Sequence, residues 1–106
     1  GILMRIKRLA DGALRIKGDM SGEEDYRFFK KTIRDLGLKE NDTLRLIILE
    51  AADVHPSICG LLLKLHNQQH IHIILDIMEL KLAYYLRDVH LLQAFSVTLL
   101  NPQDNQ

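Results

Sequence analysis

The chain has 106 residues, of which 47% are hydrophobic and 26% are charged, and 14 basic and 14 acidic side chains leave a formal net charge of 0 at pH 7. These values predict one globular domain and exclude a global charge that would draw the chain to nucleic acid or anionic lipid. No apolar run of the sequence is long enough to cross a bilayer, so we expect a cytoplasmic protein without a signal peptide and without direct membrane insertion. A single cysteine, Cys59, excludes an internal disulfide.

The two ends of the sequence bear on the domain limits. Gly1 stands in place of a start methionine, so we expect a cloning remnant there and a native start at Met4 or just before it. Residues 101–106 are polar and are predicted to fray. We therefore expect a single domain over residues 1–106, without internal repeats.

The first predicted element is a β-hairpin over residues 3–18. A three-residue loop that ends at Gly12 supplies the left-handed residue that such a turn needs. This loop pairs Ile6 with Ile16, whereas a two-residue loop would set Lys7 opposite Ile16 and mix apolar with charged positions. The hairpin is therefore predicted to have one apolar face and one basic face.

A capping box predicts the start of the first helix. Ser21 and Glu24 have the Ser-x-x-Glu spacing in which two side chains satisfy amides of the first turn. Gly37 is predicted to end this helix. Its apolar stripe consists of Tyr26, Phe29, Ile33 and Leu36.

The central unit of the chain is a strand, a short polar turn and a helix, over residues 43–65. The run LRLIIL predicts a buried strand, and the helix is predicted to start at Pro56 or Ser57 with an apolar face from Ile58 to Leu65. Between them, residues 50–59 carry acids, a histidine, a serine and the thiol. In open sheets of this kind, function usually lies at the carboxyl ends of the strands.

The rest of the chain repeats the pattern of strand and helix. Residues 67–69 are predicted to end the second helix, and IHIIL at 71–75 predicts a third apolar strand, parallel to the previous one. Residues 79–86 and 89–95 indicate one helix or two short ones. A last strand is predicted at 96–100.

Alternation along the predicted strands separates two faces of the sheet. The first face is entirely apolar and contains Met4, Ile6, Leu14, Ile16, Leu44, Leu46, Ile48, Ile71, Ile73 and Leu75. The second is basic at the hairpin and partly apolar at its centre, with Arg5, Lys7, Arg15, Lys17, Arg45, Ile47, Leu49, His70, His72 and Ile74. We therefore expect an α/β domain with a mixed sheet of about five strands and helices on the first face alone.

The order of these elements and three stretches of sequence resemble the STAS domain, named for sulphate transporters and anti-sigma-factor antagonists. The stretches are GDMSGEEDYRFFKK, RLIILEAADVHPSICGLLLKL and IILDIMELKLAYYLRDVHLLQAF, and the resemblance covers nearly the whole chain. It implies a single STAS-like domain that acts as a non-enzymatic regulatory module in bacterial signalling. His90 stands where that family usually has a glycine, so we expect a left-handed residue there.

In antagonists of this family, a partner serine kinase phosphorylates a serine in a loop at the start of the second helix. Counted back from Gly60, the usual acceptor position holds Ile58, and the loop is one residue shorter than in the family. We therefore expect Ser57 to take the acceptor's place, at a helix start whose amides tolerate a phosphate. The expected docking surface, together with the exposed part of the last helix, consists of Asp53, His55, Pro56, Ser57, Ile58, Cys59 and Gly60.

Chemical interpretations of these polar residues compete with simpler ones. Ser57, His55 and Asp53 could form a nucleophile with its base, but serine and proline at a helix start are explained by capping. His70 and His72, with His55 or His66 as a third ligand, could hold a metal, but alternation on a half-exposed strand explains them equally well. We therefore expect no catalytic residue, no metal and no cofactor.

Two alternatives concern partners. An accessory subunit of a membrane transport complex would keep the docking surface and need no phosphoacceptor, so the partner is either a kinase of the anti-sigma-factor type or a transporter subunit.

The basic face lacks interleaved aromatic residues, which favours an acidic protein partner over nucleic acid. Ile47, Leu49 and Ile74 on the same face leave room for a homodimer.

Overall fold

The computed structural model describes residues 3–101, in which five strands alternate with three helices. In chain order the elements are β1 (Arg5–Arg8), β2 (Leu14–Lys17), α1 (Glu23–Leu36), β3 (Thr43–Ile48), α2 (Pro56–Gln69), β4 (His72–Ile77), α3 (Leu80–Asp88) and β5 (Ser96–Leu99). The predicted fraying of the C-terminal tail lies, apart from Asn101, outside the described residues, as does the prediction for Gly1.

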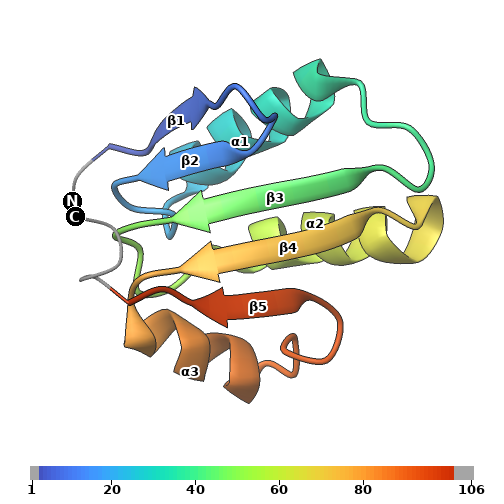
Figure 1. The fold of residues 1–106 in the computed structure, drawn as a ribbon. Coiled ribbons are helices and arrows are strands. Elements are labelled where there is room, and N and C mark those ends of the chain that lie inside the picture. The colour runs from blue at the N-terminus through green and yellow to red at the C-terminus, as the bar shows by residue number, and fades with distance from the viewer. Residues whose placement is uncertain (1–2, 102–106) are drawn as a thin grey trace.

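The five strands form one mixed sheet in the order β1-β2-β3-β4-β5 (Figure 1). β1 is antiparallel to β2, and the remaining neighbours are parallel. The hairpin has the predicted register, with Ile6 opposite Ile16, and Gly12 at its turn has the left-handed φ of 90°. The expected mixed sheet of about five strands is confirmed.

The helices cover one face of this sheet, as predicted from the alternation of apolar residues. α1 and α2 lie behind the sheet in Figure 1, and α3 flanks β4 and β5. Phe29 of α1, Ile58 of α2 and Leu82 of α3 are each 0% exposed and belong to one core with the apolar strand residues. The opposite face, which we call the open face, is covered by none of the three helices of residues 3–101 and presents the basic side chains of the hairpin.

Two helix boundaries differ from the prediction. α2 continues through residues 67–69 and ends one turn later than predicted. His70 ends the helix, because it adopts the left-handed conformation, and its N–H is bonded to Leu65 O. The polar residues 67–69 end the apolar pattern and not the helix. α1 begins after Gly22, one residue later than the predicted cap, and the Asp25 carboxylate accepts a hydrogen bond from the Gly22 N–H at 2.9 Å.

After α3, the chain follows turns and not a second short helix. His90 has φ 62°, so the expected left-handed residue is present. Leu91 and Phe95 are nevertheless buried, so the connector between α3 and β5 contributes to the core. In the part of the chain from residue 3 to residue 101, no helix has the length and apolar character needed to span a membrane.

Candidate docking site

The loop between β3 and α2 lies where the parallel strands end, on the left in Figure 1. Asp53, Pro56, Ser57 and Gly60 are exposed there, and the side chain of His55 is 18% exposed. The polar residues that the sequence predicts for this site are therefore accessible to a partner, as are Pro56 and Gly60.

Two of the predicted contact residues point the other way. Ile58 is 0% and Cys59 8% exposed, and both belong to the core. The reason is the helical period, which turns the third and fourth residues of α2 toward the sheet while Pro56 and Ser57 remain outside. Ile58 and Cys59 therefore support the surface from below and offer no side chain to a partner.

His55 connects the docking loop to α1. Its Nδ1 accepts a hydrogen bond from the Ser57 N–H at 3.0 Å, so the imidazole caps α2. Its Nε2 lies 3.0 Å from Oε2 of Glu23, and its ring stacks on Tyr26 with 5.5 Å between centroids and 13° between planes. Because Nδ1 accepts, the hydrogen-bond network assigns the proton of the neutral ring to Nε2, which donates to Glu23.

The backbone of the loop is also bound to the segment between β2 and α1. The His55 N–H donates to Met20 O at 2.8 Å, and Oε2 of Glu50 accepts from the Gly18 N–H at 2.9 Å. Segments more than thirty residues apart in sequence are thus joined by hydrogen bonds of both backbone and side chain. The loop is held in one shape while its outer residues stay in solvent.

Tyr85 of α3 holds the loop from the other side. Its hydroxyl donates to Val54 O at 3.0 Å, and it also contacts the Cys59 thiol. Burial raises the pKa of Cys59, although the hydrogen bond with Tyr85 acts in the opposite direction. Burial also raises the pKa of Tyr85, and the neighbouring thiol adds to this. Cys59 is therefore a protonated core thiol at neutral pH, and not an activated nucleophile.

The geometry also bears on the interpretation of Ser57 as a nucleophile. Nδ1 of His55 is occupied by the backbone N–H of Ser57, and Nε2 by Glu23. Neither ring nitrogen is directed to the Ser57 hydroxyl, which is the contact that a general base would need. In this arrangement, the proximity of serine and histidine in sequence is explained by helix capping.

The interpretation of His70 and His72 as neighbours on one strand face is wrong. His70 ends α2, and its Nε2 lies 3.8 Å from Oε1 of Glu40. His72 starts β4, and its Nε2 lies 3.0 Å from Oγ of Ser96 on β5. Within residues 3–101, no group of three metal-ligating side chains is assembled.

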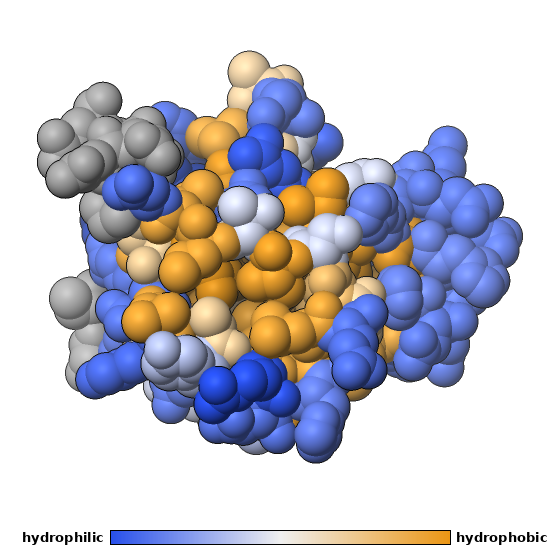
Figure 2. All heavy atoms as spheres, turned by 60° about the horizontal axis from the view of Figure 1, so that its bottom comes forward, coloured by the Kyte–Doolittle hydropathy of each residue, from blue (hydrophilic) through white to orange (hydrophobic). Residues whose placement is uncertain are grey.

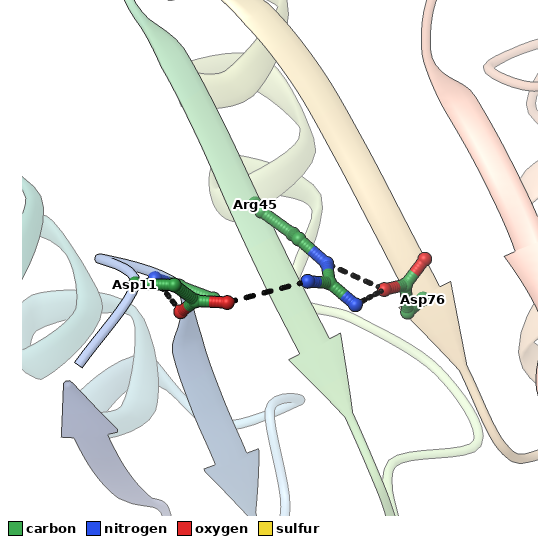
Figure 3. Close-up of polar contacts among 4 residues, drawn as sticks. Asp11, Arg45 and Asp76 are labelled. Carbon is green, nitrogen blue, oxygen red and sulfur yellow. Dashed lines mark hydrogen bonds and ion pairs between the residues drawn. The ribbon is translucent and has the colours of Figure 1, made fainter. Parts of the chain in front are cut away.

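A second polar cluster extends across the open face from the hairpin loop over β3 to β4 (Figure 3), and sequence reasoning missed it. Asp76 of β4 is buried on the open face, and Nε of Arg45 donates to its Oδ2 at 2.7 Å. Nη1 of Arg45 also lies 3.6 Å from Oδ2 of Asp11 in the hairpin loop, beside a groove of about 420 Å³. Continuing the alternation of β4 past Ile74 would have placed Asp76 on the same face as Arg45.

The basic residues of the hairpin face one another in pairs. Arg5 is opposite Lys17, and Lys7 is opposite Arg15, all on the open face. Like charges directly opposite each other on neighbouring strands are unfavourable. The hairpin thus presents a compact group of cations next to the exposed sheet surface.

Comparisons of the chain with protein-family models, with curated proteins and with solved structures found no match. The site is therefore described by its own geometry. That geometry brings together the loop after β3, the first turns of α1 and α2, and the side chain of Tyr85, which the sequence had placed in separate segments.

Proposed function

We propose that the chain is a cytoplasmic, non-enzymatic regulatory module of the STAS type, which binds a partner protein through the exposed part of the segment from Asp53 to Gly60. The observation that carries this proposal is the combination of a fixed backbone with an exposed outer surface. His55 and Val54 are bound to α1 and α3 through Glu23 and Tyr85, while Asp53 and Ser57 stay in solvent. A preformed loop loses little conformational entropy on binding, which favours recognition of a protein partner.

Ser57 is the residue at which this surface would be regulated. It occupies the second position of α2, its side chain is exposed, and its backbone N–H is already bound by His55. A phosphate there adds about 1.5 to 2 negative charges near the positive end of the helix dipole. Because the loop backbone is held by Met20 and Tyr85, the added charge changes the electrostatic surface that a partner meets and leaves the loop in place.

The docking surface is tested by site-specific photo-crosslinking in the native host. A photoreactive amino acid replaces Ser57 in one variant and Gln68 in another, which is exposed near the far end of the same helix. We expect a crosslinked protein from position 57 and not from position 68, with the partner identified by mass spectrometry. Equal crosslinking from both positions, or none from position 57, would contradict the proposal.

Regulation at Ser57 needs a separate measurement. Incubation of the unmodified protein with the serine kinase that the crosslink captures should add a phosphate to Ser57, detected by mass spectrometry, and Ser57→Ala should abolish it. Ser57→Asp should then change affinity for the crosslinked partner, whereas Ser57→Ala should leave affinity near that of the unmodified protein. A phosphate found at another residue alone would remove Ser57 as the regulatory site.

One observation favours an accessory subunit of a transport complex as the second candidate. Ile58 holds the usual acceptor position and is 0% exposed, so that position is closed to a kinase. A transport subunit would use the same rigid loop without phosphorylation. The crosslinking experiment separates the two candidates, since position 57 would then capture a permease or its ATPase and not a kinase.

A further inference from the structure

The outer edge of β5 is open. Among the strands of residues 3–101, β5 is the last of the sheet and pairs only with β4, and Ser96, Thr98 and Leu99 are exposed. The Leu100 N–H donates to Ile77 O at 2.7 Å, so the amide of Leu100 points toward β4. Since alternate residues of a strand direct their amides to opposite sides, the N–H groups of Val97 and Leu99 point away from the sheet.

The two edges of the sheet differ in charge. β1 has the sequence RIKR, so a strand that approached this edge would meet Arg5, Lys7 and Arg8. β5 has the sequence SVTL, with no charged residue and no proline. Natural proteins protect edge strands with such charges, because an uncharged edge is a template for pairing with another strand. β1 is protected in this sense, and β5 is not.

An exposed apolar surface accompanies the open edge. Of seven exposed large hydrophobic side chains in residues 3–101, five belong to α3, β5 and the connector between them. We call these five residues the β5-side patch: Leu80, Tyr84, Val89, Leu92 and Leu99, each between 39% and 49% exposed. Figure 2 turns this side forward and shows apolar atoms gathered across it. Contiguous apolar surface of this kind marks an interaction site.

We propose that β5 pairs with β5 of a second copy of this chain in antiparallel orientation, which joins two sheets into one and covers the β5-side patch. The outward N–H of Val97 then donates to the carbonyl oxygen of Leu99 of the second copy, the N–H of that Leu99 donates to the carbonyl oxygen of Val97, and the same pair of bonds is repeated across the two-fold axis. Each patch meets an identical apolar patch.

Charge favours a second copy as the occupant. The β5 edge carries no charge, and the chain has a formal net charge of 0, so two identical edges meet without repulsion. On α3, the guanidinium of Arg87 lies 4.9 Å from the centroid of the Tyr84 ring and pairs with Asp88 at 3.2 Å. A dimer through the open face would instead place Lys7 and Arg15 of one copy near the cations of the other copy, and these like charges repel.

The arrangement has a consequence for the docking site. Antiparallel strands run in opposite directions, so the carboxyl ends of the two sheets lie at opposite ends of the dimer. Both copies of the docking loop, including Ser57, remain free. The dimer would be bivalent, which strengthens binding to a partner that presents two sites. The dimer itself does not depend on the proposed docking function.

Sedimentation velocity over a range of protein concentrations tests the dimer. We expect a monomer–dimer equilibrium, and we expect Leu99→Lys to raise the dissociation constant at least about tenfold, because a charge on the edge blocks strand pairing. Phe28→Lys is the matched control, since it places the same charge on an exposed apolar residue of α1, and it should leave the equilibrium unchanged. Circular dichroism confirms that both variants are folded.

Hydrogen exchange gives a second readout on the backbone. The amides of Val97 and Leu99 should become more protected as protein concentration rises, whereas amides of the β1 edge should not. A monomer at all concentrations, or a dimer that Leu99→Lys leaves intact, would overturn the proposal. A purified monomer whose β5 is covered by a different protein in the native host would also overturn it. Leu99→Lys should not affect crosslinking from position 57, so the two proposals fail independently.

Discussion

Arg45 of β3 covers the carboxylate of Asp76 on β4. Nε and Nη2 of Arg45 both contact Oδ2 of Asp76, at 2.7 Å and 2.6 Å (Figure 3). The Asp76 side chain is 8% exposed and that of Arg45 is 44% exposed, so the guanidinium shields the acid from solvent on a face that no helix covers.

Removing the arginine should therefore cost stability. Arg45→Met leaves the Asp76 carboxylate buried without its hydrogen bonds, and we expect the free energy of unfolding to fall by about 1–3 kcal/mol. The double variant Arg45→Met with Asp76→Leu should recover most of this loss, since apolar groups of similar size replace a buried ion pair at little cost. Urea denaturation measures the unmodified protein, both single variants and the double variant, and additive effects of the two substitutions would contradict a direct coupling.

Substitution of His55 separates its role as a helix cap from its contacts with α1. His55→Ala removes the acceptor for the Ser57 N–H and the contact with Glu23, and we expect a loss of about 0.5–2 kcal/mol from the cap alone. His55→Asn keeps a side-chain acceptor at the cap and should lose less. Equal stability of the two variants in urea denaturation would show that the cap contributes little.

The buried thiol of Cys59 and the partly buried phenol of Tyr85 predict a loss of stability in alkali. Burial raises the pKa of both groups, so the folded state holds their protons more tightly than the unfolded state. The stabilisation is complete below the unfolded pKa and decreases as the pH rises above it, which for the thiol is about 8.5. The free energy of unfolding, measured from pH 7 to pH 10, should fall less steeply in Cys59→Ala than in the unmodified protein. Parallel curves would contradict the prediction.

The cation pairs of the hairpin predict a stabilising substitution. Lys7 lies opposite Arg15, and Lys7→Glu would replace a like-charge pair with an opposite-charge pair. We expect a gain of about 0.2–1 kcal/mol in the free energy of unfolding, which decreases at high salt. Lys64→Glu makes the same change of charge on the exposed side of α2 and serves as control. An equal effect of both substitutions would assign the gain to net charge.

Local patterns in the sequence predicted the elements whose causes are local. The register of the hairpin follows from Gly12 and from the two-residue period of the strands, and both were correct. The end of α2 was wrong, because its left-handed cap is His70, a residue type that adopts this conformation less often than glycine. The α1 cap lies at Gly22 and not at Ser21, because the Asp25 carboxylate, and not that of Glu24, accepts the hydrogen bond that closes the first turn. Its donor is the N–H of Gly22.

The candidate docking site was located by sequence and shaped by the tertiary structure. The sequence by itself determined the alternation of strands and helices, the apolar face that the helices cover, and the segment at 53–60 as a polar turn and helix start that follow a buried strand. Only the tertiary structure decided which of those residues face solvent, and that Glu23 and Tyr85 hold the loop. It also brought Arg45 onto Asp76 and left β5 with an open edge. These features join residues distant in sequence, and periodicity within one segment carries no information about its neighbours in space.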